Sequence, residues 1–170
     1  DLPELLDYCR RSADPVGRLV LRVSGHRDAQ LDRYSDQICT GLQLLNHLQD
    51  LGEDLHERDR IYFPREDLVR FLVTEDQLRQ PHADAAVRAF VLHWAERIGA
   101  MFQAGWPLVQ IVRGRLRSEL RAILRGAAAV LARIRAEGGD VLGGRVHLSK
   151  GERVRTVLAG LCSARLPHFV

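Results

Sequence analysis

Two aspartates one helical turn apart, Asp50 and Asp54, are the residues of this sequence best suited to chemistry. Side chains at positions i and i+4 of a helix lie on one face, with Cβ atoms about 6 Å apart, so both carboxylates can approach one cation. Mg²⁺ favours one or two carboxylates and completes its coordination with water and phosphate oxygens. The pair therefore predicts a site for Mg²⁺ and a diphosphate group. The same spacing is also typical of a solvated helix face, on which the carboxylates would have no function.

The acidic pair belongs to a polar stripe on a long helix that the sequence predicts from about Asp28 to Asp54. At about 100° per residue, the side chains of the stripe share an arc of roughly 100°. They are Gln43, Asn46, Asp50, Glu53, Asp54 and Glu57. Leucines occupy the opposite side of the helix, and apolar residues border the stripe. Because of this border, we expect the stripe to face a cavity.

Helical periodicity extends over almost the whole chain. Apolar residues recur at intervals of three and four, and no segment sustains the alternation of a β-strand. The predicted fold is an all-α helical bundle, with residues 1–170 as a single domain, which is an ordinary domain size. The segment 56–64 should leave the helix, because Pro64 disfavours helical geometry at the preceding residue. Further helices are predicted at about 3–11, 16–23, 65–72, 74–78, 83–103, 116–136 and 151–164.

The composition excludes several classes of protein. Apolar residues make up 46% and charged residues 28% of the chain, which is globular rather than disordered composition. Three widely spaced cysteines indicate neither a disulfide framework nor a zinc site. The seven histidines have no Cys or Asp partner at metal-binding spacing, and no role is assigned to them. The arginines behind the net charge of +3 are dispersed, which argues against a nucleic-acid interface.

The cellular location can also be predicted from the sequence. No apolar run approaches the roughly 20 residues that a membrane-spanning helix needs, and the first residues lack the basic and then apolar order of a signal peptide. We therefore expect a cytoplasmic protein.

Two segments of the chain resemble motifs of the squalene/phytoene synthase family. The stretch QLLNHLQDLGEDLHERDRIYFPREDL is similar to the family's second aspartate-rich motif, in which Q-x-x-N-x-x-x-D-x-x-x-D precedes R-x-Y-x-P. The matching residues are Gln43, Asn46, Asp50, Asp54, Arg60, Tyr62 and Pro64. Upstream, YCRRSADPVG resembles the family segment Y-C-x-x-x-A-x-x-V-G. Gln49 and the wording ICTGLQLLNHLQD are most similar to the bacterial hydroxysqualene synthases of hopanoid synthesis.

The resemblance implies the C-terminal part of an isoprenoid synthase fold and a role for each matched residue. Asp50 and Asp54 would bind Mg²⁺ and act in catalysis, because the ion neutralises the diphosphate leaving group. Asn46, Arg60 and Tyr62 would contact the substrate, with the Arg60 guanidinium binding a phosphate oxygen.

A tyrosine and three apolar residues are candidates for the hydrocarbon part of the substrate. Tyr8 matches a catalytic family tyrosine near the carbocation, where an aromatic face stabilises positive charge and a hydroxyl can direct water or a proton. Phe90, Trp94 and Met101 could line a channel for the prenyl tail, although ordinary core packing also explains them.

The reaction implied by the resemblance is ionisation of presqualene diphosphate, followed by rearrangement and capture of the cation by water. One alternative is head-to-head condensation of two prenyl diphosphates, such as farnesyl diphosphate. The resemblance covers nearly all 170 residues but only the later part of a family member. The family's first aspartate motif has no counterpart here, so N-terminal helices of the same enzyme are an implied partner, and association with the inner membrane surface is compatible with a lipid substrate. Another alternative is a non-catalytic helical remnant that binds a lipid or a protein partner.

Overall fold

The structure, a computed structural model, describes residues 1–144, 146, 148–149, 151–152, 154–156, 158 and 166–169. These residues contain no strand, which confirms the all-α class. The helices are α1 (Leu2–Ser12), α2 (Asp14–Val23), α3 (Ala29–Gln49), α4 (Leu51–Arg58), α5 (Arg65–Arg70), α6 (Glu75–Leu78), α7 (Ala85–Gly105), α8 (Pro107–Ile111) and α9 (Gly114–Ala136). Part of the predicted helix at 151–164 lies outside the described residues. Within the described part, no helix is long and apolar enough to cross a membrane.

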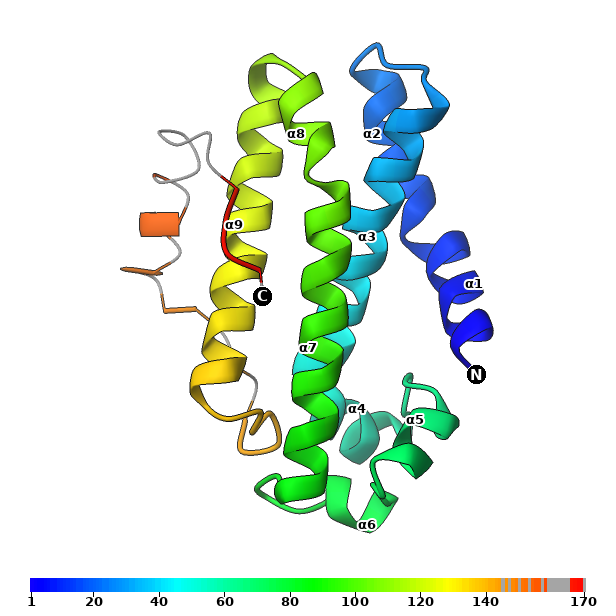
Figure 1. Ribbon diagram of the computed structural model, residues 1–170, viewed down its shortest axis with the longest axis vertical. Helices are drawn as coiled ribbons and strands as arrows, with labels where there is room; N and C mark the ends of the chain where they lie inside the picture. The colour runs from blue at the N-terminus through cyan, green and yellow to red at the C-terminus, as the bar shows by residue number, and fades with distance from the viewer. Residues whose placement is uncertain are drawn as a thin grey trace.

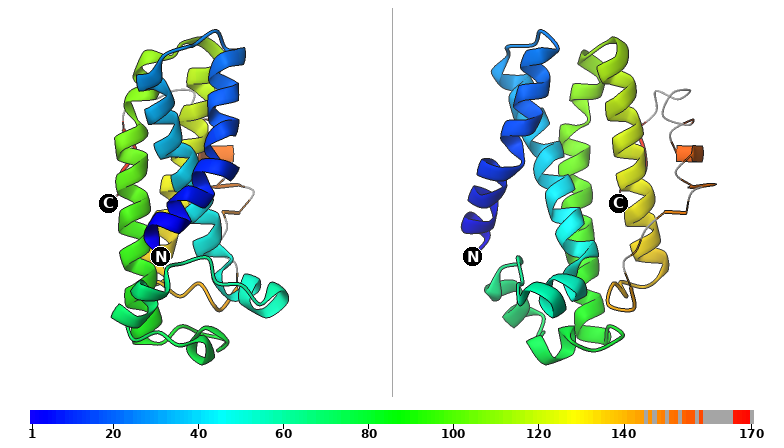
Figure 2. Two further views of the ribbon diagram at one scale, coloured as in Figure 1. Left: turned by 90° about the vertical axis from the view of Figure 1, so that its right-hand side faces the viewer. Right: turned by 180° about the vertical axis from the view of Figure 1, so that it is seen from behind.

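The long helices α3, α7 and α9 form the body of the bundle (Figure 1). Helix α3 packs most extensively against α7 and also contacts α2 and α1, whereas α9 packs against α7 and α8. Viewed from the side and from behind, α1 and α2 lie beside α3, and the short helices α5 and α6 lie at one end of the bundle (Figure 2). This arrangement places α3 between the first two helices and α7, with Asn46 near its end and Asp50 directly after it.

Side-chain caps fix where the two central helices begin. The carboxylate of Asp28 accepts the backbone N–H groups of Gln30 and Leu31 at 2.6 and 3.2 Å, at the start of α3. Asp84 accepts the N–H of Val87 at 2.9 Å at the start of α7. Each cap satisfies donors that the first helical turn leaves without an intrahelical acceptor.

The predicted continuous helix from Asp28 to Asp54 is wrong, because the chain bends at Asp50. This residue has φ −97° and ψ 11°, which separates α3 from α4. The helical hydrogen bond from Asp54 N–H to Asp50 O nevertheless remains, at 2.7 Å. Aspartate and the nearby Gly52 are both poor helix formers, which weakens the helix at this point. Helix α4 then continues to Arg58, beyond the predicted end.

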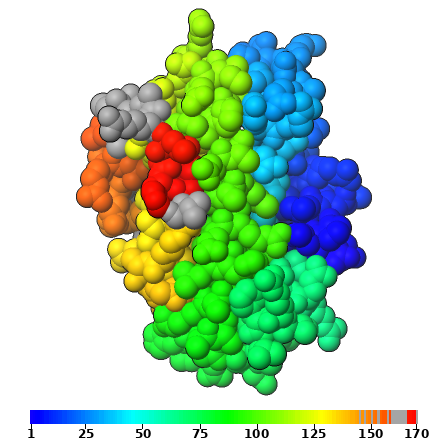
Figure 3. Space-filling model, in the orientation of Figure 1, coloured from blue at the N-terminus to red at the C-terminus, as the bar shows by residue number. Residues whose placement is uncertain are grey.

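The last described residues lie on the face formed by α7 and α9 (Figure 3). Phe169 is buried, and its ring lies 5.6 Å from that of Phe102. Arg135 donates to the Phe169 carbonyl oxygen at 2.6 Å. Helix α9 ends as predicted, with Gly138 and Gly139 at positive φ values of 62° and 80°.

Glycines allow α3 and α7 to approach closely. A Cβ atom on Gly105 of α7 would lie 2.9 Å from the Tyr34 carbonyl oxygen and 2.5 Å from Ile38 Cγ1, both on α3. A Cβ atom on Gly41 of α3 would lie 2.7 Å from the ring of Phe102. No side chain fits at either position without movement of the neighbouring helix.

Gly105→Ala should therefore destabilise the protein by about 1 to 3 kcal/mol, because the added methyl group overpacks the contact between α3 and α7. Gly126→Ala is the matched control: Gly126 lies within α9, and a Cβ atom there would meet nothing within 4 Å. This control should keep or raise stability by up to about 1 kcal/mol, since alanine favours helix. Urea unfolding of both variants measures the difference. Equal stability of Gly105→Ala and the wild type would refute the close-contact explanation.

Candidate functional site

The bend between α3 and α4 places the two aspartates in different environments. The side chain of Asp54 is 7% exposed, whereas Asp50 at the bend is half-buried. Asn46, one turn before Asp50, is exposed, as are Glu53 and Glu57. The predicted polar stripe therefore does not face a cavity as a whole: one edge is buried and the other is exposed.

Two predicted residues from distant parts of the chain come together beside this bend. Tyr8 on α1 and Tyr62, in the segment after α4, have ring centroids 6.0 Å apart. His47, on α3, is stacked on Tyr62 with ring centroids 3.8 Å apart and an interplanar angle of 14°. The Tyr8 and His47 rings are 6.1 Å apart. We call Tyr8, His47 and Tyr62 the aromatic cluster.

The sequence prediction missed His47. Its side chain is buried, and its Nε2 atom lies 3.1 Å from Nε2 of Gln43. The signal was present in the helical spacing, because His47 follows Gln43 by one turn and precedes Asp54 by two. Metal-binding spacing, however, carries no information on stacking against an aromatic ring from a distant segment.

Electrostatics favour a neutral His47. Burial lowers the pKa of this imidazole, and the negative charge of Asp54 acts in the opposite direction. A neutral ring can stack on Tyr62 without bringing an unpaired positive charge into a buried position.

Arg58 was also missed, although it follows Asp54 by one turn on the same helix. Its guanidinium forms an ion pair with the Asp54 carboxylate. This hydrogen bond and the charge of Asp54 raise the pKa of Arg58. The Arg58 side chain is 53% exposed, so the pair joins a buried carboxylate to a cation at the surface.

The segment containing Arg60 begins with a sharp reversal at Asp59. Asp59 has φ 52°, a left-handed conformation that ends α4. Its carboxylate accepts a hydrogen bond from Arg79 at 2.7 Å. Arg60 is exposed, and its backbone N–H donates to the Asp54 carbonyl oxygen at 3.2 Å. The reversal brings Tyr62 back towards α3.

A cavity of about 310 Å³ lies where α1 meets the segment 61–65. Tyr8 and Tyr62 both line it, so the aromatic cluster forms part of its wall. The backbone N–H of Leu2 donates to Glu66 at 3.1 Å and ties the start of α1 to α5. The cavity is therefore bounded by segments that the sequence separates by more than fifty residues.

A second cavity, of about 230 Å³, is an apolar groove between α2, α3, α8 and α9. Ser35 and Glu119 are the polar side chains among its lining residues. The remaining lining residues are Val16, Gly17, Val20, Leu21, Ile38, Cys39, Leu42, Leu108, Leu116, Leu120 and Ile123. Leu42 precedes Asp50 by eight residues on α3. Leu42 thus lies about 12 Å along the axis of α3 from Asp50 at the helix end, and Asp54 follows on α4.

Phe90 and Trp94 belong to the core and do not line this groove, so of the two explanations offered for them the structure favours ordinary core packing. Both are fully buried. Their rings lie 5.5 and 4.8 Å from Phe63, which packs them into the end of the bundle near α4. Met101 is half-buried and packs against the core. A stripe of large apolar residues on a helix is the same whether it faces a core or a channel, so the sequence could not separate the two.

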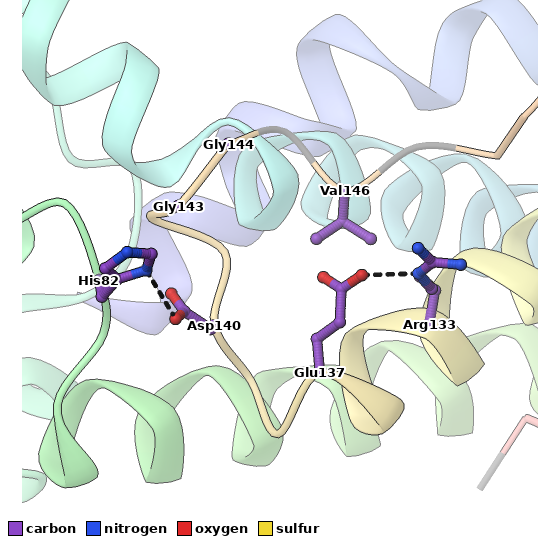
Figure 4. A pocket seen from close by; sticks show the side chains of 7 residues that line it. All are labelled: His82, Arg133, Glu137, Asp140, Gly143, Gly144 and Val146. Atoms are coloured by element: carbon purple, nitrogen blue, oxygen red, sulfur yellow. Dashed lines mark hydrogen bonds and ion pairs between the residues drawn. The ribbon is translucent and has the colours of Figure 1, made fainter.

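The largest described cavity, about 620 Å³, is an open pocket with residues of both charges (Figure 4). Asp140 lies 3.3 Å from His82 and accepts hydrogen bonds from Arg88 and the Ala83 N–H at 2.7 and 3.0 Å. Arg88 also donates to the carbonyl oxygen of Glu137 at 2.9 Å. These groups join the end of α9 to the start of α7, so their arrangement is structural.

Gln49 contacts a residue of this open pocket. Its buried amide donates to the carbonyl oxygen of Val146, one of the residues that line the pocket. The end of α3 is therefore joined to a late segment of the chain.

The donor groups fit a magnesium ion that is shared with a phosphate ligand. Asp50 and Asp54 supply two carboxylates, which is the usual protein contribution to such an ion. Among the described residues, no group of three or more Asp, Glu, His or Cys side chains could hold a metal. Two carboxylates alone would leave the remaining positions of such an ion to water or to phosphate oxygens.

His47 should titrate below the usual histidine pKa of about 6.5. Asp54→Asn should lower the pKa of His47 further, because it removes the negative charge that favours imidazolium. The unfolded state binds the proton more tightly, so this histidine makes stability rise with pH up to about 6.5. Proton–carbon NMR of the ring measures the titration, with Asp36→Asn on the same helix as control. A pKa of His47 that rises in Asp54→Asn would contradict the assignment.

The chain is similar to several known proteins. The sequence profile described as squalene/phytoene synthase matches residues 1–152. A hydroxysqualene synthase from Sinorhizobium fredii is 37% identical over 147 residues, which are 86% of this chain and 49% of that protein. A phytoene synthase from Thermus thermophilus is 33% identical over 166 residues, which are 96% of this chain and 56% of that protein.

A solved structure shows the same fold. The squalene synthase HpnC from Alicyclobacillus acidocaldarius matches with a TM-score of 0.76 and 43% identity, over 81% of this chain and 52% of that one. The chain thus spans about half the length of the relatives it matches. The expected isoprenoid synthase fold and the likeness to bacterial hydroxysqualene synthases are confirmed. The chain belongs to the squalene/phytoene synthase family.

Proposed function

We propose that this chain provides the diphosphate-binding part of an enzyme that ionises presqualene diphosphate and adds water to give hydroxysqualene. The observation that carries this proposal is that α3 lines an apolar groove, while a carboxylate pair follows directly on the same stretch of chain, at the end of α3 and on α4. A prenyl diphosphate has the same two parts, a hydrocarbon tail and an anionic head. The similarity to hydroxysqualene synthases supports this substrate.

Asp50 and Asp54 would bind Mg²⁺ at the head of the substrate. The ion would neutralise the diphosphate and stabilise it as a leaving group. Asn46, Arg60 and Tyr62 remain the predicted substrate contacts, with Arg60 suited to a phosphate oxygen. The exposure of Asn46 and Arg60 leaves both side chains accessible to an incoming ligand.

The aromatic cluster would border the carbocation. Ring faces of Tyr8 and Tyr62 carry negative quadrupole charge, which stabilises a nearby cation without forming a bond to it. The Tyr8 hydroxyl could direct the water that captures the cation. The groove residues Val20, Leu42 and Leu120 would cover the tail and exclude other water molecules.

A second candidate is head-to-head condensation of two prenyl diphosphates. The similarity to a phytoene synthase over 96% of this chain favours it. Both reactions use the same head group and metal, so the aspartates do not discriminate between them. The products do discriminate.

Asp54→Asn should reduce Mg²⁺-dependent turnover about 100-fold or more, because it removes a ligand of the ion that stabilises the leaving group. Binding of inorganic pyrophosphate with Mg²⁺, followed by calorimetry, should weaken in the same variant. Asp36→Asn is the control, since Asp36, on α3, is likewise paired with an arginine, Arg18. Wild-type turnover in Asp54→Asn would refute the proposed site.

Incubation with presqualene diphosphate and Mg²⁺ should yield hydroxysqualene, identified by mass spectrometry. Farnesyl diphosphate alone should be consumed poorly. Rapid formation of presqualene diphosphate from farnesyl diphosphate, or of phytoene from geranylgeranyl diphosphate, would instead establish the second candidate.

A further inference from the structure

Asp54, a predicted metal ligand, already forms an ion pair with Arg58 in this structure. Asp54 is the more buried of the two aspartates, with 7% of its side chain exposed. A buried carboxylate needs a positive partner, because burial without one is strongly unfavourable. Arg58 provides that partner from within the same helix, one turn away. The protein therefore neutralises Asp54 by its own means before a metal arrives.

Arg58 and Mg²⁺ cannot both lie close to this carboxylate at low cost. Two cations that share one anion repel each other, and the repulsion is strong where water is largely excluded. Metal binding at Asp54 must consequently compete with the guanidinium.

Arg58 is able to leave Asp54. Its side chain is 53% exposed and lies in the last turn of α4, just before the reversal at Asp59. A guanidinium forms bidentate, charge-assisted hydrogen bonds with phosphate oxygens as well as with carboxylates. A diphosphate at the aspartates would offer such oxygens within reach of the same helix.

We propose that Arg58 is a movable counter-ion, which pairs with Asp54 in the free protein and transfers to the diphosphate when Mg²⁺ takes its place. This inference rests on the proposed function, because it assumes a magnesium–diphosphate ligand at Asp50 and Asp54. The transfer keeps each charge paired in both states. It also couples the two ligands: Mg²⁺ alone must displace Arg58, whereas Mg²⁺ with diphosphate gives Arg58 a new anion.

Arg58→Gln tests the proposal through two affinities, measured by calorimetry on the 170-residue chain. Removal of the competitor should tighten binding of Mg²⁺ alone, on the order of 10-fold. Removal of the phosphate contact should weaken binding of inorganic pyrophosphate at saturating Mg²⁺, again on the order of 10-fold. A purely structural role of Arg58 would change both affinities in the same direction or neither.

Two further variants complete the experiment. Arg58→Lys keeps the positive charge but not the planar guanidinium. Its affinity for Mg²⁺ alone should therefore be as low as that of the wild type, and its affinity for pyrophosphate should lie between those of Arg58→Gln and the wild type. It also serves as the decisive variant if Arg58→Gln does not fold. Arg79→Gln, which removes the arginine paired with Asp59 in the neighbouring segment, should leave both affinities unchanged.

The outcomes separate this inference from the proposed function. Parallel changes in the two affinities of Arg58→Gln, with binding abolished in Asp54→Asn, would overturn the counter-ion role and leave the metal site intact. Unchanged binding in Asp54→Asn, or no binding by the wild type, would overturn both.

Discussion

The close contact between α3 and α7 is the constraint on which the arrangement of the site depends. Gly41 and Gly105 remove the side chains that would otherwise separate these helices. Since α3 is fixed against the core on one side, its other side is available to α1 and α2. That geometry brings Tyr8 to His47 and leaves the apolar groove open along the same helix. Packing in the core thereby determines where the polar and the apolar parts of a ligand could lie.

The charge of Asp54, beside the bend between α3 and α4, is paired within the protein. Asp54 is paired with Arg58, and His47 is favoured in its neutral form by burial. An ion-paired carboxylate costs less to bury than an unpaired one, but it is also less available to a second cation. Under the proposed function, the pair with Arg58 would therefore oppose binding of Mg²⁺ alone at Asp54. A ligand that offers Arg58 a new anion would remove this opposition.

The sequence was sufficient for the helical class, for most helix boundaries and for the family, because periodicity, caps and motif spacing are local properties. It was insufficient for contacts between distant segments. The meeting of Tyr8 with Tyr62 and the stacking of His47 depend on how α1 and the reversal at Asp59 pack against α3. Trp94 is a core residue because Phe63, from the distant segment after α4, packs against its ring. The bend at Asp50 depends on a small difference in backbone energy, which periodicity does not report.

The hydrogen bond from Gln49 to the Val146 carbonyl oxygen connects the middle of the chain to a segment almost a hundred residues later. The amide lies beside Asp50, on the last residue of α3. Any shortening of the chain that deletes Val146 would strand this buried donor without an acceptor, at a cost of about 1 to 3 kcal/mol. Attempts to isolate a minimal catalytic helix pair from this protein must therefore retain the segment that follows α9, however remote it looks in the sequence.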